Sequence, residues 1–200
     1  KDAVEDYYTK IYEYLGIEIS DLEIDSETEF YSISYDENGN AYLLDENNTM
    51  VAGPYKVIED DFQYWNNKIT RYIGENGLYG YLNKEGKIIT EPIFQKASIF
   101  QDGTAMVSMN DGMIYYIDTS GKRITKDYSE GYPFEHQGSY ARVKSEDGTW
   151  GIINRQDKMV FKGADHIEEL PMVTTLGGAI VNGQAVLFSL NLGETKEITV

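Results

Sequence analysis

Short runs of alternating apolar and polar residues, separated by turn-forming residues, dominate the chain after its first twenty positions. Segment 78–83 is an aromatic-rich run that the turn Lys84-Glu85-Gly86 closes, and segment 104–109 is a second short run after the turn Gln101-Asp102-Gly103. Alternation with a period of two is typical of half-buried β-strands, and glycine in such a turn supplies the positive φ that a hairpin needs. Turn signals that recur every ~8–12 residues predict an all-β sandwich, barrel or propeller.

Residues 1–20 follow a different pattern. Apolar side chains recur there at three- and four-residue spacing up to Gly16, which predicts a short amphipathic N-terminal α-helix and a linker. We expect this helix to pack on the β-repeat domain, 21–200, or to join it to an upstream region. Because the chain begins with Lys1 rather than Met, we expect it to be a fragment or a processed form. The apolar positions of the helix are Val4, Tyr7, Tyr8, Ile11, Tyr12, Tyr14 and Leu15.

The strand pattern repeats along the chain. The windows Leu78–Lys87, Met113–Lys122 and Thr149–Lys158 align without gaps, each with Asn or Asp at the same place. A fixed period of this kind is the sign of an architecture built from one repeated supersecondary unit. Extending the register in both directions gives five copies whose anchor residues are 38, 35, 36 and 36 positions apart, namely Asp45, Asn83, Asp118, Asn154 and Leu190.

Each repeat is expected to supply four short strands. A fifth, mixed unit would combine 22–39 with 185–200, because each end segment supplies strands that the other lacks. Pairing them would remove two exposed sheet edges. We therefore predict a five-bladed, β-propeller-like ring closed by its termini, with an open β-repeat array as the alternative. The four complete units are expected near 41–74, 77–109, 113–148 and 149–183.

The middle repeats resemble the WG β-repeat family, in which Trp-Gly-Tyr-Ile-Asp, a Gly-Lys turn, a proline-bearing segment and a later Phe-x-x-Gly-x-Ala-x-Val recur. The resemblance covers about 40–193. It implies a bacterial β module, in an envelope or secreted setting, with no activity attached to the motif. We interpret the Trp-Gly pair as a packing element, in which a ring lies across backbone beside a glycine. The residues that carry the resemblance are Trp150-Gly151-Ile152-Ile153-Asn154, Tyr79-Gly80-Tyr81-Leu82-Asn83, Gly86-Lys87, Gly121-Lys122, Pro92 and Phe100–Val107.

Composition narrows the set of partners. With 34 acidic and 17 basic residues the formal net charge is −17, which repels nucleic acids and anionic lipid surfaces. No apolar run approaches the roughly 18 residues of a membrane helix, so we predict neither nucleic-acid binding nor membrane insertion. The chain has no cysteine, which excludes thiol catalysis, thiolate metal sites and disulfides. From the resemblance we expect an extracellular or cell-envelope location.

Candidate catalytic groups are few and scattered. His136 and His166 each lack a partner histidine at metal-ligand spacing, and no phosphate-binding glycine loop precedes a helix. Adjacent carboxylates such as Asp60-Asp61 and Glu168-Glu169 occur by chance in so acidic a chain, so we do not interpret either pair as a catalytic site. We therefore predict no enzyme, no cofactor and no resident metal. The segments 36–40 and 45–48 cluster oxygen ligands, and we interpret both as hairpin turns, with weak calcium binding as the alternative.

Aromatic and amide residues that interrupt the repeat are the candidate ligand contacts. The first group is Tyr64, Trp65 and Asn66, and the second candidate is Tyr132 in the loop 130–133. Rings with nearby amides suit sugars and peptides, although a core position for Trp65 is the competing interpretation. The sequence favours a noncatalytic binding module for a protein or glycan. A structural spacer for a missing domain and an acidic inhibitor of a basic protein are the alternatives.

Overall fold

The computed structural model describes residues 31–198 with gaps at 64–67, 136, 171–175 and 192–193. These residues form strands and one 3-10 turn, η2 (Asp61–Gln63), so the predicted all-β class is confirmed. The N-terminal helix expected in 1–20 lies outside the described residues. Within the described part of the chain, no helix has the length and apolar character needed to cross a membrane.

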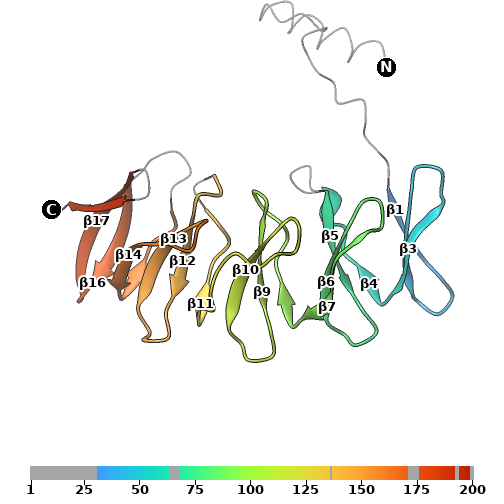
Figure 1. Ribbon diagram of the computed structural model, residues 1–200, viewed down its shortest axis with the longest axis horizontal. Coiled ribbons are helices and arrows are strands. Elements are labelled where there is room, and N and C mark those ends of the chain that lie inside the picture. The colour runs from blue at the N-terminus through green and yellow to red at the C-terminus, as the bar shows by residue number, and fades with distance from the viewer. Residues whose placement is uncertain (1–30, 64–67, 136, 171–175, 192–193, 199–200) are drawn as a thin grey trace, which may run out of the picture. The chain divides into compact units, whose positions relative to one another are not determined.

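The strands form five antiparallel sheets that follow one another in chain order, from blue to red in Figure 1. Neighbouring strands in a sheet are also neighbours in sequence, so each connection is local. The first sheet contains β1 (Ser32–Tyr35), β2 (Ala41–Leu44) and β3 (Met50–Tyr55); the second β4 (Val57–Ile58), β5 (Ile69–Ile73), β6 (Tyr79–Asn83) and β7 (Ile88–Phe94); the third β8 (Lys96–Ala97), β9 (Thr104–Ser108) and β10 (Ile114–Asp118); the fourth β11 (Glu130–Gly131), β12 (Tyr140–Lys144), β13 (Trp150–Asn154) and β14 (Met159–Ala164); the fifth β15 (His166–Ile167), β16 (Leu176–Val181), β17 (Gln184–Asn191) and β18 (Glu194–Ile198).

The Asn and Asp anchors close hairpin turns. The side-chain oxygen of Asn83 accepts a hydrogen bond from the N–H of Lys87 at 2.8 Å, and that of Asn154 accepts one from Lys158 at 3.0 Å. Three residues after each of these four Asn and Asp anchors the backbone is left-handed, as at Gly86 with φ 76°. Glycine adopts this conformation without steric cost, and Asn and Asp tolerate it. The repeated turns predicted from the sequence are confirmed.

The sheets are out of phase with the predicted units. Each four-stranded sheet combines the last two strands of one repeat with the first two strands of the next, as where β5 pairs with β6 through Tyr72 and Gly80. The boundaries predicted near 74–77 and 109–113 therefore fall inside sheets. A period alone does not say where a unit begins, because cutting the same repeat at another point leaves the period unchanged.

The strand pairing also differs from the predicted mixed unit of 22–39 and 185–200. Strand β1 pairs with β2, with Ile33 opposite Leu43, and β17 pairs with β16, with Val186 opposite Ala179. Each end segment thus finds its partner across a short turn, which costs less chain entropy than pairing the two ends of the chain. The complementary ends, from which we predicted a closed ring, are each used within their own terminal sheet.

The hydrophobic core consists of clusters between consecutive sheets. The residue two positions before each of the first four anchors belongs to one of these clusters and is 0% exposed. We call these positions the interface centres. Burying a side chain of this size contributes about 1.5–3 kcal/mol, so the contacts between sheets stabilise the array as well as the sheets themselves. The four interface centres are Leu43, Tyr81, Tyr116 and Ile152.

The glycines of the Trp-Gly motif have a packing role. A Cβ on Gly80 would lie 2.6 Å from a ring carbon of Tyr72, and one on Gly151 would lie 2.8 Å from the carbonyl oxygen of Phe161. Real Cβ atoms do not approach other atoms so closely, and only glycine leaves room for the neighbouring strand. At Gly80 a ring lies against the glycine, as the packing interpretation expected, whereas at Gly151 the closest atoms are the sulfur of Met159 and the main-chain oxygen of Phe161.

Candidate binding site

Four side chains of the fourth sheet share one face around Tyr132. The N–H of Tyr132, just after β11, donates to the carbonyl oxygen of Arg142 on β12 at 3.0 Å. On the same sheet Lys144 pairs with Glu130 on one side and with Trp150 on the other. Residues opposite each other, or two apart on one strand, point to the same face. We call Glu130, Tyr132, Arg142, Lys144 and Trp150 the Tyr132 platform.

The rings and cations of the platform lie close to one another. The guanidinium carbon of Arg142 lies 4.0 Å from the centre of the Tyr132 ring, and the Trp150 ring lies 5.6 Å from it at an interplanar angle of 31°. Lys144 Nζ lies 5.8 Å from the Trp150 ring and 2.7 Å from Glu130 Oε1. Tyr132 is nevertheless 43% exposed. A cation and an indole therefore orient an aromatic side chain that remains open to solvent.

A buried ion pair supports the platform from the inside. Arg142 donates to both carboxylate oxygens of Glu135, at 2.9 and 2.5 Å, and its Nη1 donates to the carbonyl oxygen of Ile167 in the fifth sheet at 3.0 Å. Glu135 also accepts a hydrogen bond from the N–H of Leu170 at 3.1 Å. Bidentate pairs of this kind fix geometry as well as charge. The orientation of Arg142, and with it of Tyr132, is set by contacts in two sheets.

The third sheet contributes one more contact to the platform. The hydroxyl of Tyr116 donates to the carbonyl oxygen of Tyr132 at 2.5 Å. Burial raises the pKa of the Tyr116 hydroxyl, so that it keeps its proton and remains a donor. The backbone of Tyr132 is therefore held by hydrogen bonds to both the third and the fourth sheet.

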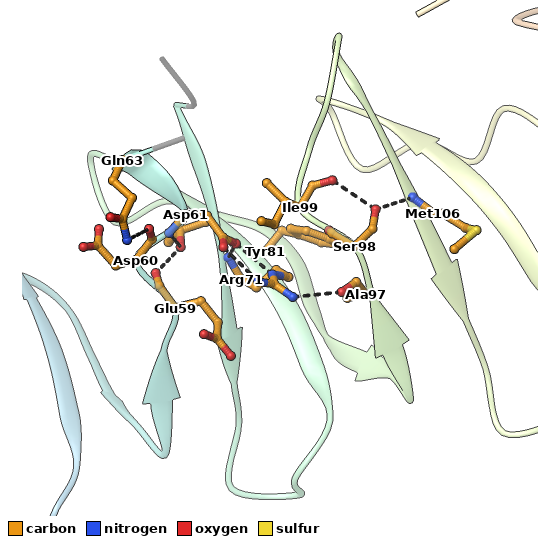
Figure 2. A network of polar contacts seen from close by, with 11 residues as sticks. Glu59, Asp60, Asp61, Gln63, Arg71, Tyr81, Ala97, Ser98, Ile99 and Met106 are labelled. Carbon is orange, nitrogen blue, oxygen red and sulfur yellow. Dashed lines mark hydrogen bonds and ion pairs between the residues drawn. The ribbon is translucent and has the colours of Figure 1, made fainter. Parts of the chain in front are cut away.

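The second sheet contains a related ion pair, Asp61 and Arg71, which Figure 2 shows together with Tyr81. Arg71 Nε donates to Asp61 Oδ2 at 2.8 Å and Nη2 donates to Oδ1 at 2.9 Å. Its Nη1 donates to the carbonyl oxygen of Ala97 in the third sheet at 3.2 Å. The Tyr81 hydroxyl donates to the carbonyl oxygen of Ser98 at 2.6 Å. These two contacts connect the second sheet to the third.

Asp61 stands where other sheets have an apolar side chain. It lies four residues after the first residue of β4, and the residues four after the first residues of β8, β11 and β15 are Phe100, Phe134 and Leu170, all buried. Asp61 is only 2% exposed. A carboxylate at such a depth is costly unless it is paired and hydrogen-bonded. Arg71 supplies that pairing, and the hydrogen bond from Arg71 to Asp61 raises the pKa of the guanidinium.

Both the second and the fourth sheet have an ion pair of this kind, but only the fourth sheet has the residues of the Tyr132 platform. At the register positions of Tyr132, Lys144 and Trp150, the second sheet has Glu59, Ile73 and Tyr79. The second sheet therefore lacks both the ring above the guanidinium and the lysine beside the indole. Among these two sheets, only the fourth combines a supported cation with an exposed aromatic side chain.

Carboxylates in the hairpin turns are occupied by the turns themselves. Asp36 Oδ1 accepts from the N–H groups of Asn38 and Asn40, and Oδ2 accepts from the Asn40 side chain and the Tyr42 hydroxyl. These hydrogen bonds, with that of the Asn40 side chain largest, lower the pKa of Asp36. Asp45 accepts from two N–H groups of its own turn. Both segments are hairpin turns, and no three acidic or histidine side chains in the described residues come together as metal ligands.

Of the predicted binding residues, the structure describes Tyr132. Tyr64, Trp65 and Asn66 lie outside the described residues, as does His136. His166 is on β15 with its Nε2 3.5 Å from Glu168 Oε1, on the surface. The platform includes two residues that we did not single out from the sequence, Arg142 and Lys144. In the sequence, the feature that could have indicated them is a pair of basic residues two positions apart in a chain that has only 17 basic residues.

Comparison with solved structures finds β-propellers at low sequence identity. The chain aligns with the WD40 β-propeller domain of Doa1 at 12% identity and a TM-score of 0.36, covering 82% of this chain and 63% of that one. It aligns with BamB from Moraxella catarrhalis at 15% and 0.39, covering 84% and 57%. With Hsv2 of Kluyvelomyces marxianus the values are 12% and 0.43, covering 87% and 66%. The chain thus spans less than two thirds of the length of each.

Comparison with sequences gives one family. No curated protein matches the chain. Residues 79–112, which run from β6 to just after β9, match the family model of the WG containing repeat. This segment contains Tyr79 and Gly80, the latter being one of the two packing glycines described above. The chain therefore carries a WG containing repeat.

Proposed function

We propose that this chain is a noncatalytic binding module that recognises a glycan or a protein through the Tyr132 platform. The observation that carries the proposal is the exposed tyrosine held by Arg142 and Trp150. A ring that is already oriented loses little conformational freedom on binding, so more of the contact energy remains as affinity. Lys144 and Glu130 place a donor and an acceptor beside the ring, as sugars and peptides require.

The setting we propose is a bacterial envelope or secreted material. It rests on the resemblance of the repeats to WG β-repeats, and the match of 79–112 to that family's model supports it. The net charge of −17 is compatible with a partner that is neutral or basic.

Titration calorimetry against panels of bacterial cell-wall glycans and of peptides tests the proposal. For a ligand that binds, Tyr132→Ala should weaken the affinity about tenfold to a hundredfold, the effect typical of a central interface residue. The matched control is Tyr35→Ala, which removes a tyrosine that is 58% exposed on the first sheet and should leave the affinity unchanged. An unchanged affinity in Tyr132→Ala would contradict the site. Turnover of a glycoside or ester panel by the wild-type chain would contradict the noncatalytic role.

A further inference from the structure

The charges of the Tyr132 platform and its support balance one another. Arg142 pairs with Glu135, and Lys144 pairs with Glu130. An anionic ligand would meet the carboxylate of Glu130 beside the ammonium of Lys144, and the chain's net charge of −17 would repel it at longer range. The platform therefore disfavours an anionic ligand.

The guanidinium of Arg142 disfavours a cationic ligand. It lies over one face of the Tyr132 ring, 4.0 Å from the ring centre. A second cation on the open face would be attracted by the ring and repelled by the positive charge already on the other side of it. Lys144, on the same face of the sheet, adds to that repulsion. Because Tyr132 is 43% exposed, its open face suits a neutral group with an apolar surface.

The exposed ion pair of the platform has hydrogen-bonding capacity that the chain does not use. Lys144 Nζ donates to Glu130 Oε1 at 2.7 Å, and an ammonium group has three N–H donors. In the described part of the chain no other residue donates to the Glu130 carboxylate. The two side chains are 29% and 58% exposed. A donor and an acceptor therefore lie next to each other and are both open to a ligand.

A vicinal diol on a sugar ring matches this pair. Adjacent hydroxyl oxygens on a pyranose are about as far apart as two hydrogen-bonded oxygens, and each hydroxyl both donates and accepts. One hydroxyl can donate to Glu130 Oε2 while its neighbour accepts from Lys144 Nζ, without separating the ion pair. The apolar C–H face of the same sugar can then lie on the open face of the Tyr132 ring.

A neutral peptide is the competing ligand, and it fits the platform less well. Its main chain also offers donors and acceptors, but its apolar groups are on side chains that rotate independently of them. Ordering those groups around one ring and one ion pair costs conformational entropy. A pyranose carries its apolar face and its hydroxyls on a single rigid ring, so the arrangement of the platform favours a sugar.

We propose that the ligand of the Tyr132 platform is a neutral glycan with a free vicinal diol on a pyranose ring. Tyr132 binds the apolar face of the sugar, and Glu130 and Lys144 bind the two hydroxyls. This proposal rests on the binding role proposed for the platform, and it narrows the choice between glycan and protein to one class of glycan.

Calorimetric titration with matched neutral hexasaccharides tests the proposal. The probes are 1,4-linked hexasaccharides of glucose, mannose and xylose, whose internal residues keep two adjacent hydroxyls. The control is the 1,3-linked glucose hexasaccharide, whose internal residues have no adjacent free hydroxyls. At least one of the 1,4-linked probes should bind, and the control should bind about tenfold more weakly or less, because hydrogen bonds to charged groups contribute that much. Periodate oxidation and reduction of the probe that binds, which cleaves its diols, should abolish binding.

Two matched variants test the acceptor. Glu130→Ala should weaken binding of the 1,4-linked probe about tenfold and make its affinity similar to that of the 1,3-linked control. Glu59→Ala removes a half-buried carboxylate from the second sheet, at the register position of Tyr132, and should leave the affinity unchanged. Circular dichroism should show both variants to be folded like wild type.

The outcomes separate this proposal from the binding role on which it rests. Absence of binding by every 1,4-linked probe, or equal affinity for the 1,3-linked control, would overturn the diol proposal. If peptides then bind and Tyr132→Ala abolishes their binding, the platform remains the binding site and its ligand is a peptide. If Tyr132→Ala leaves the affinity for every ligand unchanged, both proposals are overturned.

Discussion

The second and fourth sheets carry the same kind of ion pair in two arrangements. In the second sheet the acid, Asp61, occupies a position that is apolar elsewhere, and its side chain is only 3% exposed. In the fourth sheet Phe134 keeps that apolar position, and the next residue, Glu135, is the acid. The ring of Tyr132 lies on Arg142 in the fourth sheet, while the second sheet has Glu59 at that place.

The comparison separates a structural role from a surface role. In both sheets Nη1 of the arginine donates to a main-chain oxygen of the next sheet, that of Ala97 or that of Ile167. The arginine therefore connects sheets in both cases. Only in the fourth sheet does it also orient an exposed ring, so the two sheets make the same internal contact with different consequences at the surface.

Removing the acid of the second sheet should have the largest effect on stability. Asp61→Ala leaves the Arg71 guanidinium without its partner, and breaking a buried pair in this way costs about 3–5 kcal/mol. Urea unfolding followed by circular dichroism measures the loss. The double variant Asp61→Phe with Arg71→Met copies Phe100 and Met106 of the third sheet and should recover most of the stability, because an apolar pair replaces a buried ion pair at little cost. A double variant as unstable as Asp61→Ala would refute the equivalence of the sheets.

Removing the acid of the fourth sheet should cost less. The side chain of Glu135 is 17% exposed, so water partly compensates Arg142 in Glu135→Ala, and we expect a loss of about 2 kcal/mol. The same unfolding experiment measures it. Unlike Asp61→Ala, this variant should also weaken ligand binding in the calorimetric titration, because the platform loses its support. Equal effects of the two variants on binding would contradict the separation of roles.

The tyrosine hydroxyls that connect sheets should contribute about 1 kcal/mol each. Tyr81→Phe removes the donor to Ser98, and Tyr116→Phe removes the donor to Tyr132. Both variants should unfold at slightly lower urea concentrations than wild type. If Tyr116→Phe alone also weakens ligand binding, the hydroxyl contributes to positioning the platform.

The same tyrosines predict the response to alkaline pH. Burial raises the pKa of Tyr81 and Tyr116 above the ordinary value of about 10, so above that pH the unfolded chain releases protons that the folded chain keeps. Stability is fully present below pH ~10 and should fall as the pH rises further. In Tyr81→Phe the fall should be shallower, which urea unfolding at a series of pH values measures. An equal slope in the variant and wild type would contradict burial of this hydroxyl.

The smallest effect on stability is expected at the exposed pair of the platform. Lys144→Ala removes an ion pair with Glu130, whose side chain is 58% exposed, and such pairs contribute at most about 1 kcal/mol. The melting temperature should change little. The affinity for ligand should nevertheless fall measurably, because Lys144 lies beside the Trp150 ring of the platform. A binding constant that is unchanged would remove Lys144 from the site.

The strands and turns were predictable because their determinants are local. Alternation and a turn ended by Gly86 or Gly121 are visible within a dozen residues. The assignment of strands to sheets was not, because the period is the same wherever a unit is cut. The register of β17 was also predicted wrongly, by one residue. Asn191 at the end of β17 lies opposite Glu194 of β18, whereas Asn83 pairs with Lys87, so the two hairpins have different spacings.

The site was predictable only in part for a similar reason. Tyr132 was visible as an aromatic residue in a loop. Arg142 and Lys144 lie within a strand, where charged residues at alternating positions suggest a solvent-facing side. The residue that accepts the hydrogen bonds of Arg142 is Glu135, which lies in a loop. Asp61 was indistinguishable from other acidic residues until its partner, ten residues later, was known.

Chemical-shift mapping on the isotope-labelled chain shows whether a ligand binds at the Tyr132 platform. Cell-wall glycan fragments and peptides would be titrated in turn into the wild-type chain and Tyr132→Ala. A ligand that binds should shift the backbone signals of Tyr132, Lys144 and Trp150 in the wild type, and these shifts should disappear in the variant. Shifts confined to other sheets, or the same shifts in Tyr132→Ala, would show that the ligand does not bind at the Tyr132 platform.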